Sequence, residues 1–355
     1  MNRDRAEGPS QFIHFSLQEL RVELLRGCPL LCVHCSAHAA PLHPVLLPLK
    51  RALTLIDEFA DGGGRRITFT GGEPLIYPGL ERVLQRAHER GLAIRLFSSG
   101  IIFQKEERIA GCALLQRIAP LLNTVMYSIY AAEAEAHDRV THVPGSFQLT
   151  VQAIQQTVAL GIGAEIHFVP TQLNYRHLPA VVALASALSV PRVGILRFVP
   201  QGRGKTKAGD LALDRKAHQW LRENILELRS RYPEVTLSSG SAYNLLAVET
   251  PSPCNAGINQ LVVNADGSIL PCSAFGSVRI KDNVGNILTR PLQVVWQHSL
   301  YLQQVRHALA GMTTCSGCLA QKTLAAGRID AQVPDSLEEM TLHQEFVSKD
   351  LLRND

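Results

Sequence analysis

Three cysteines lie close together near the start of the chain, at Cys28, Cys32 and Cys35. Gaps of three and then two residues match neither a disulfide framework nor a common zinc pattern. A structural zinc ion or a ferredoxin-type cluster takes four protein ligands, so three thiolates leave one metal coordination position open. Because an open iron is reactive, the spacing predicts a reactive 4Fe-4S cluster. The alternative is a zinc knuckle that takes His34 or His38 as its fourth ligand.

A second group of cysteines further along the chain has enough members for a complete metal centre. Its members are Cys254, Cys272, Cys315 and Cys318. Four thiolates would saturate a 4Fe-4S cluster, which suits electron transfer or a structural role better than direct binding of substrate. A zinc ion held by the same four thiolates is the alternative. The remaining cysteine, Cys112, lies in an apolar helical stretch, and we expect it to pack as a small core residue.

The composition predicts a globular protein in a reducing compartment. The chain has 355 residues, of which 46% are hydrophobic and 19% charged, enough for one large core and a smaller unit. A formal net charge of +4 is too weak to indicate a nucleic-acid surface. We find no signal sequence and no apolar stretch that could span a bilayer, so we expect a cytoplasmic protein without a membrane or nucleic-acid partner. Eight cysteines in that compartment are more typical of metal ligands or catalytic thiols than of disulfides.

Six short apolar runs, each rich in β-branched or aromatic residues, alternate with stretches of helical periodicity. The runs are residues 20–27, 66–70, 93–99, 123–130, 164–170 and 193–200. Strands separated by helices pair in parallel, and a parallel sheet needs both faces covered. We therefore predict an α/β fold, a partial (β/α)6 barrel of the TIM-like kind. The loop with three cysteines then follows the first strand, at the rim where barrel enzymes place their chemistry.

The C-terminal part of the chain is expected to form a smaller unit. Residues 201–210, rich in glycine and lysine, indicate a linker or mobile loop. Asp266-Gly267 predicts a β-hairpin within residues 259–272, and a helix over 291–309 precedes the last two cysteines. The expected divisions are an N-terminal extension (1–19), the barrel (20–200), a linker and helix (201–250), an auxiliary cluster domain of hairpin plus helix (251–320) and a C-terminal tail (321–355).

The spacing of the three cysteines resembles the signature of the radical S-adenosylmethionine (radical SAM) enzymes. The resemblance implies that SAM chelates the open iron through its amino and carboxylate groups. It also implies that an electron from the cluster cleaves SAM to a 5'-deoxyadenosyl radical, which abstracts hydrogen from the substrate. Gly71-Gly72-Glu73-Pro74, at the end of the second predicted strand, resembles the family element that binds the methionine ammonium. Without the cysteines these four residues would indicate a plain turn.

Three further positions match family sites at strand ends. The resemblance implies a role in SAM binding for Ser99 after the third strand, Ser128 on the fourth and Arg197 on the sixth. Ser128 is equally well explained as a small core residue with a hydrogen-bonded hydroxyl. Arg197, on an apolar strand, needs a partner, which the SAM carboxylate or the substrate would supply. We assign no general acid or base, because carboxylates such as Glu165 and Asp266 have structural explanations of equal weight.

The C-terminal cysteines resemble those of the SPASM/twitch extensions that follow radical SAM barrels. The segments Gly285-Asn286-Ile287 and Val295-Trp296 are similar to parts of the same family pattern. A complete SPASM domain has seven cysteines and two auxiliary clusters, whereas four cysteines fit the shorter twitch form with one. The resemblance therefore implies three cofactors: a 4Fe-4S cluster that binds SAM, SAM itself, and one auxiliary 4Fe-4S cluster.

The stretch 128–147 resembles a pattern of SPASM-type enzymes that modify ribosomally synthesised peptides. Read from the residues alone it is structural, a strand end and a loop followed by a helix with Ser146 as its N-cap. We therefore predict a radical SAM enzyme that cross-links, epimerises or oxidises a peptide. About 19 residues before the first strand cannot fold a leader-binding domain, so a separate leader-binding protein is one expected partner. The other is an electron donor such as flavodoxin or ferredoxin.

Two other functions remain open. The first is a twitch-type enzyme acting on a small molecule, by alcohol dehydrogenation or nucleotide rearrangement. An acidic substrate could meet the cluster Arg203, Lys205 and Lys207, although such a run usually marks a solvated loop. The second is a non-catalytic iron-sulfur electron-transfer protein, which the Gly71 to Pro74 element disfavours because an electron carrier needs no SAM cradle.

Overall fold

A single curved sheet forms the centre of the computed structural model, which describes residues 15–243, 246, 253–278, 284–310 and 317–332. In these residues the sheet has nine strands in the order β11-β10-β1-β2-β3-β6-β7-β8-β9. The strands are β1 (Glu19–Glu23), β2 (Arg66–Thr70), β3 (Ala93–Ser98), β6 (Thr124–Ser128), β7 (Gly163–Phe168), β8 (Arg192–Ile195), β9 (Thr236–Ser239), β10 (Gln260–Val263) and β11 (Ile269–Leu270). A separate hairpin pairs β4 (Ile101–Gln104) with β5 (Glu107–Ala110).

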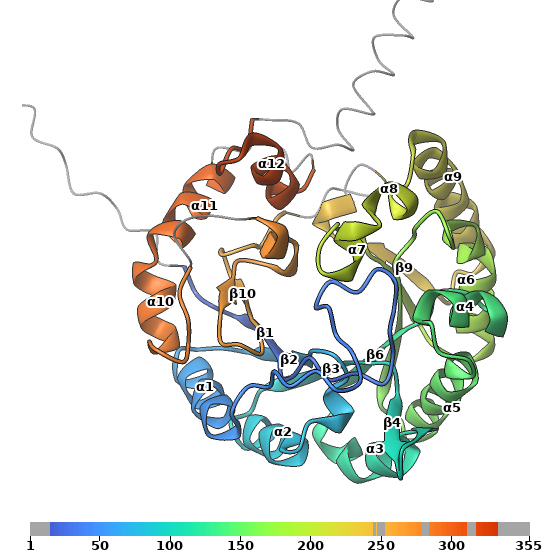
Figure 1. Cartoon of the computed structure of the whole chain (residues 1–355), viewed down its shortest axis with the longest axis horizontal. Coiled ribbons are helices and arrows are strands. Elements are labelled where there is room, and N and C mark those ends of the chain that lie inside the picture. The colour runs from blue at the N-terminus through green and yellow to red at the C-terminus, as the bar shows by residue number, and fades with distance from the viewer. Residues whose placement is uncertain (1–14, 244–245, 247–252, 279–283, 311–316, 333–355) are drawn as a thin grey trace, which may run out of the picture.

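Helices surround this sheet on the outside, as Figure 1 shows. They are α1 (Leu49–Asp61), α2 (Leu80–Glu89), α3 (Cys112–Ile118), α4 (Ala134–Thr141), α5 (Ser146–Ala159), α6 (Leu178–Ala187), α7 (Arg203–Thr206), α8 (Ala208–Leu211), α9 (Arg215–Arg231), α10 (Leu292–His298), α11 (Leu300–Ala310) and α12 (Leu319–Ala326). Successive side chains of a strand point to opposite faces. Leu20, Val22 and Phe69 accordingly join the core with Leu55 and Phe59 of α1, all almost fully buried.

The barrel prediction is confirmed. The strands β1, β2, β3, β6, β7 and β8 follow one another in the sheet and pair in parallel, as six successive strand-helix units require. The last of these strands is shorter than expected and ends at Ile195, because Pro200 and the glycines beyond it disfavour a longer one. Arg197 therefore lies in the loop after β8, not on the strand.

The hairpin around Asp266-Gly267 is also confirmed, since β10 and β11 pair antiparallel. It does not stand apart from the barrel, however, because β10 pairs in parallel with β1. An edge strand presents a row of unpaired N–H and C=O groups, and β10 satisfies those of β1. The C-terminal part of the chain thus extends the barrel sheet at one edge, while β9 extends it at the other.

Local structure differs from the expectations in four places. Residues 201–210 are not an irregular linker, because they include α7 and most of α8. The helix expected over 291–309 is two helices, α10 and α11. Ser146 is not the N-cap of α5. Gly145 holds that position at a φ of 82°, and the Asp138 carboxylate accepts hydrogen bonds from the backbone N–H groups of Gly145 and Phe147. Cys112 is the first residue of α3 and only partly buried.

No helix in the described part of the chain is both long enough and apolar enough to span a membrane.

Candidate functional site

The loop with three cysteines follows β1 and brings its thiols together at the carboxyl end of the parallel strands. Cys28 is buried, while Cys32 and Cys35 are partly buried. Burial and the neighbouring thiol of Cys32 raise the pKa of Cys28 well above its ordinary value. Burial and Cys35 raise the pKa of Cys32 to about 12. The mutual repulsion of the thiolates shows that they converge, and positively charged iron would relieve it.

The backbone of this loop is held from two sides. From α4, the carbonyl groups of Val140 and Thr141 accept hydrogen bonds from Val33 and Leu31 at 2.9 and 3.0 Å. From α7, the guanidinium of Arg203 donates to the carbonyl oxygen of Cys32 at 2.9 Å and to that of Ala39 at 2.8 Å. The charge of Arg203 also lowers the pKa of Cys32, against the larger effect of burial.

Arg203 is therefore a site residue that the sequence did not identify. From the sequence, Arg203 was expected either to contact an acidic substrate or to lie in a solvated loop. The structure shows instead that it holds the cysteine loop in place. In the sequence, the glycine before Arg203 was the feature that could have indicated this contact. Gly202 has a φ of 55°, and a Cβ there would lie 2.5 Å from the carbonyl oxygen of Cys35.

The Gly71-Gly72 turn after β2 lies directly against the residues that precede Cys28. Gly72 N–H donates to the carbonyl oxygen of Leu25 at 2.6 Å, and Glu73 N–H donates to that of Gly27 at 2.8 Å. A Cβ on Gly71 would lie 2.3 Å from the Leu25 oxygen, and one on Gly72 would lie 2.0 Å from the Gly27 oxygen. The two motifs recognised separately in the sequence are thus hydrogen-bonded neighbours, and only glycine permits this approach.

Glu73 connects this turn to the loop after β3. Its side chain is fully buried, and both carboxylate oxygens are engaged. One accepts from Leu75 N–H at 3.0 Å and Ser98 Oγ at 2.7 Å, and the other accepts from Ser99 N–H at 2.7 Å and Ser99 Oγ at 2.6 Å. Burial raises the pKa of Glu73, and these hydrogen bonds oppose the rise. Glu73 and the Ser99 hydroxyl therefore position the turn, which leaves its backbone as the surface open to a ligand. Pro74 begins the short 3-10 helix that follows.

Ser128 lies at the end of a central strand, and Arg197 lies in the loop beyond the end of another. Ser128 is the last residue of β6 and is partly buried next to His167 in the register of β7. Burial and the neighbouring Cys32 thiol raise the pKa of Tyr130 well above its ordinary value, the side chain of Ser128 opposes the rise, and the Tyr130 ring meets the edge of the His34 ring at 4.7 Å. Arg197 donates to the carbonyl oxygen of Ala242 at 3.3 Å. Tyr130 thus joins one predicted residue to the cysteine loop, a contact that spacing alone could not reveal.

Three of the four C-terminal cysteines also converge. Cys254 precedes β10, Cys272 follows β11, and Cys318 caps α12. Burial raises the pKa of Cys272, and the thiols of Cys318 and Cys254 raise it further. Cys315, the fourth predicted ligand, lies outside the described residues.

The residues present fit iron-sulfur clusters at both places. Each group offers thiols, the ligand type that these clusters require, and at Gly71 and Gly72 any side chain would collide with the backbone of the cysteine loop. Within the described residues, no three His, Cys, Asp or Glu side chains are grouped as ligands of one metal ion. A cubane makes a different demand, because its irons occupy separate corners and each takes its own cysteine.

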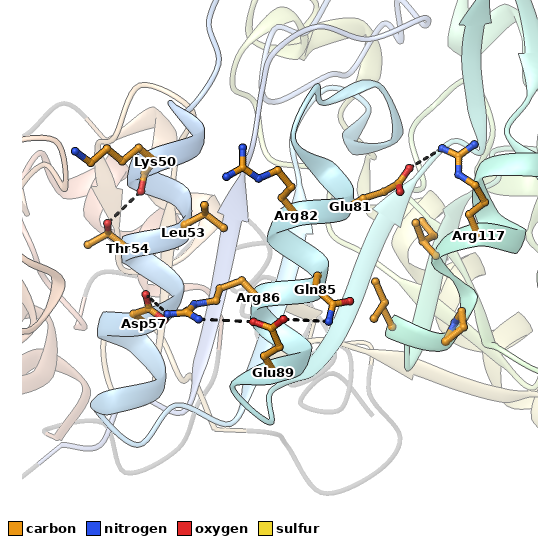
Figure 2. Close-up of a pocket in the computed structure, with 13 residues that line it drawn as sticks. Lys50, Leu53, Thr54, Asp57, Glu81, Arg82, Gln85, Arg86, Glu89 and Arg117 are labelled. Atoms are coloured by element: carbon orange, nitrogen blue, oxygen red, sulfur yellow. Dashed lines mark hydrogen bonds and ion pairs between the residues drawn. The ribbon is translucent and has the colours of Figure 1, made fainter.

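A hollow on the outer surface of the barrel contains none of the predicted site residues. It measures about 830 Å³ and lies between α1, α2 and the region of α3 (Figure 2). Ion pairs cross it from Arg86 to Asp57 at 2.8 Å and from Arg117 to Glu81 at 2.5 Å. Such exposed pairs contribute little stability, and we assign this surface no chemistry.

Comparison with known proteins identifies two families in the chain. The model of the radical SAM superfamily matches residues 22–185. The SPASM model, described as an iron-sulfur cluster-binding domain, matches residues 254–319. The first match contains the three cysteines and the Gly71-Gly72 turn, and the second contains all four C-terminal cysteines.

Among curated relatives, an AdoMet-dependent heme synthase of Methanosarcina barkeri is 24% identical over 89% of this chain and 93% of its own length. Mycofactocin maturase MftC of Mycolicibacterium smegmatis is 25% identical over 89% of this chain and 81% of its own length. Among solved structures, Streptococcus suis SuiB bound to its precursor peptide SuiA has a TM-score of 0.71 at 18% identity, covering 91% of this chain and 76% of SuiB. The chain therefore belongs to the radical SAM superfamily, as an enzyme with a C-terminal SPASM domain and with S-adenosylmethionine and iron-sulfur clusters as its cofactors.

Proposed function

We propose that this enzyme cleaves SAM reductively and modifies a C–H position of a ribosomally synthesised peptide by cross-linking, epimerisation or oxidation. The observation that carries the proposal is the direct hydrogen bonding between the cysteine loop and the Gly71-Gly72 turn. When bound, the cluster and SAM supply the 5'-deoxyadenosyl radical that abstracts hydrogen from the substrate. The protein chain holds the cluster and SAM in position.

The proposed ligands of the SAM-binding cluster are Cys28, Cys32 and Cys35. Backbone groups of Gly71, Gly72 and Pro74 would contact SAM. Glu73 and Ser99 would hold that backbone in place. Ser128 and Arg197 would complete the site from the neighbouring strand ends. Arg203 holds the cysteine loop through two carbonyl groups, so the three thiols keep their spacing when iron is absent. A preorganised loop loses less conformational entropy when the cluster binds.

The proposed ligands of one auxiliary 4Fe-4S cluster are Cys254, Cys272, Cys315 and Cys318. We propose that residues 20–200 form the catalytic barrel and 251–320 the auxiliary cluster domain, with 1–19 as the extension and 321–355 as the tail. Residues 201–250, expected as a linker and helix, include α7, α8 and α9 and add β9 to the barrel sheet. An electron donor such as flavodoxin or ferredoxin, a separate leader-binding protein and a cytoplasmic location complete the proposal.

A peptide substrate is supported by two of the similar proteins. One is named a mycofactocin maturase, and the other was solved with its precursor peptide. A second candidate, a small molecule with a tetrapyrrole ring, is favoured by the relative named a heme synthase. It is a different small molecule from those of the alcohol dehydrogenation and nucleotide rearrangement considered from the sequence.

Cys32→Ala tests the radical chemistry. After anaerobic reconstitution we expect about eight irons per chain in the wild type, as two cubanes require, and about four in the variant. Addition of SAM and dithionite should release 5'-deoxyadenosine from the wild type only. Cys112→Ala is the matched control, because Cys112 lies outside both cysteine groups. Release of 5'-deoxyadenosine by the Cys32 variant at the wild-type rate would show the ligand assignment to be wrong.

The substrate class is tested by mass spectrometry. The reconstituted enzyme is incubated with a candidate precursor peptide encoded beside its gene, and separately with a propionate-bearing porphyrin. A mass change in the peptide supports the first candidate. A change confined to the porphyrin supports the second and removes the peptide proposal.

A further inference from the structure

The lumen of the barrel contains a small cavity with an unusual set of charges. Its volume is about 120 Å³, and its walls include Arg21, Arg95, Phe97, Met126 and His167 from four strands of the barrel. Cys272 and Ser273 close one side. The cavity therefore borders the proposed auxiliary cluster, and its charged walls come from the interior of the parallel sheet.

One carboxylate in this region already interacts with two arginines and a histidine. Glu165 lies 3.0 Å from Arg95, 3.5 Å from Nε2 of His167 and 3.6 Å from Arg192. Burial raises the pKa of Glu165, but the hydrogen bond from His167 and the charges of the two arginines outweigh it and hold the pKa below its ordinary value. Glu165 is thus ionised and fully committed to groups other than Arg21.

Arg21 is the cation without a carboxylate partner. Its guanidinium donates to Ser273 Oγ at 2.8 Å and lies 5.0 Å from the centre of the Phe97 ring. It forms no ion pair with any carboxylate in the described part of the chain, and Glu19 on the same strand is paired with Arg66 at 2.5 Å. Burial lowers the pKa of Arg21, and the neighbouring Cys272 thiol opposes the fall.

A partly buried guanidinium that is only partly paired costs free energy, and an anion that enters the cavity would recover it. Guanidinium groups bind carboxylates through two parallel hydrogen bonds. The cavity has room for several water molecules, enough for a carboxylate and its first carbons. Phe97 and Met126 offer apolar contacts for those carbons.

We propose that this cavity is a subsite for a carboxylate group of the substrate, with Arg21 as the residue that binds it. The inference rests on the proposed function, since it assumes that a substrate enters the barrel. It narrows the substrate class to molecules that carry a carboxylate: a peptide with an acidic side chain or a free C-terminus, or a tetrapyrrole with propionates.

The first experiment measures binding of trifluoroacetate to the anaerobically reconstituted enzyme by fluorine NMR, without SAM or reductant. Trifluoroacetamide is the neutral probe of similar shape. We expect saturable binding of the carboxylate only, at least a tenfold loss of affinity in Arg21→Gln, and a smaller loss in Arg21→Lys. Arg82→Gln is the surface control, because Arg82 is an exposed arginine on α2 (Figure 2).

Equal binding of the two probes, or wild-type affinity in Arg21→Gln, would overturn the subsite. The comparison of the two probes uses the wild type alone, so it decides the matter even if a variant does not fold. SAM is absent from this binding experiment. A negative result would therefore leave the test of 5'-deoxyadenosine release unaffected, and a failure to release 5'-deoxyadenosine would leave the binding result unaffected.

The competing explanation is that Arg21 only balances the charge of the auxiliary cluster beside Cys272. A redox titration followed by EPR separates the two. A shifted midpoint potential of that cluster in Arg21→Gln, together with unchanged affinity for trifluoroacetate, would show that Arg21 serves the cluster and that the proposal is wrong.

Displacement of bound trifluoroacetate identifies the source of the carboxylate. A blocked glutamate tripeptide is compared with its glutamine analogue, and a propionate-bearing porphyrin with its methyl ester. Displacement by the glutamate peptide supports a peptide carboxylate. Displacement by the porphyrin alone supports the subsite but contradicts the peptide as its occupant.

Discussion

Glu73 shows how a residue expected at a ligand contact can act through its neighbours. Its two carboxylate oxygens accept four hydrogen bonds from the backbone and side chains of adjacent loops, and no part of it is exposed. Each oxygen faces a backbone N–H, so an ionised carboxylate suits the position and an amide does not. The residue therefore links the loop after β2 to the loop after β3.

Glu73→Gln is expected to destabilise the fold by about 1–3 kcal/mol, because its NH₂ group would face the N–H of either Leu75 or Ser99 and leave a buried donor without an acceptor. The free energy of unfolding in urea measures this effect. Glu227→Gln, on the exposed side of α9, is the matched control and should lie within about 0.5 kcal/mol of the wild type. Equal stability of the two variants would mean that Glu73 does not hold these loops together.

The loop after β1 and the turn after β2 form one structural unit. The unit depends on two backbone hydrogen bonds that reach across from residues 72 and 73 to residues 25 and 27. Arg203 of α7 supports it from the opposite side. Because the unit is built from main-chain groups, it requires the absence of side chains at Gly71 and Gly72 more than it requires any particular side chain.

Gly72→Ala should separate the turn from the cysteine loop, because its Cβ would lie 2.0 Å from the Gly27 carbonyl oxygen. We expect a loss of about 1–3 kcal/mol in unfolding free energy. Iron should fall from about eight to about four per chain, because the auxiliary site is untouched. Gly209→Ala provides the control, since a Cβ there would contact nothing within 4 Å. Full iron content in the Gly72 variant would contradict this account of the unit.

The barrel and the C-terminal hairpin are joined at the top of β1 as well as along it. Arg26 lies 3.0 Å from both Glu23 and Asp266, so one guanidinium connects the end of the first strand to the hairpin turn. Burial raises the pKa of Glu23 to about 7, although Arg26 opposes the rise. The stability of the whole chain should therefore depend on pH through Glu23.

A raised carboxyl pKa means that the folded state holds the proton more tightly than the unfolded state, so this contribution to stability falls as pH rises. This contribution is lost between pH 4.5, the ordinary pKa of a glutamate carboxyl, and about pH 7, and the loss is roughly 3 kcal/mol. The unfolding free energy of Glu23→Gln should increase relative to wild type between pH 5 and pH 7.5. A difference that stays constant over this range would show that Glu23 does not titrate as described.

The sequence alone determined the fold class, the two cysteine groups and the glycine turn. Each of these depends on local chemistry: a strand-helix alternation forces parallel pairing, and thiol spacing limits the kind of metal centre. Resemblance then connected the cysteine groups to a family, and the family models matched the same segments.

Only the tertiary structure decided which of these parts touch. It paired β10 with β1, placed Arg203 on the cysteine loop, and set Arg21 against Ser273 inside the barrel. These contacts join residues far apart in the chain, and neither periodicity nor spacing encodes them. Charge balance in a buried space depends on every strand that lines it, so it appears only when the strands are assembled into the sheet.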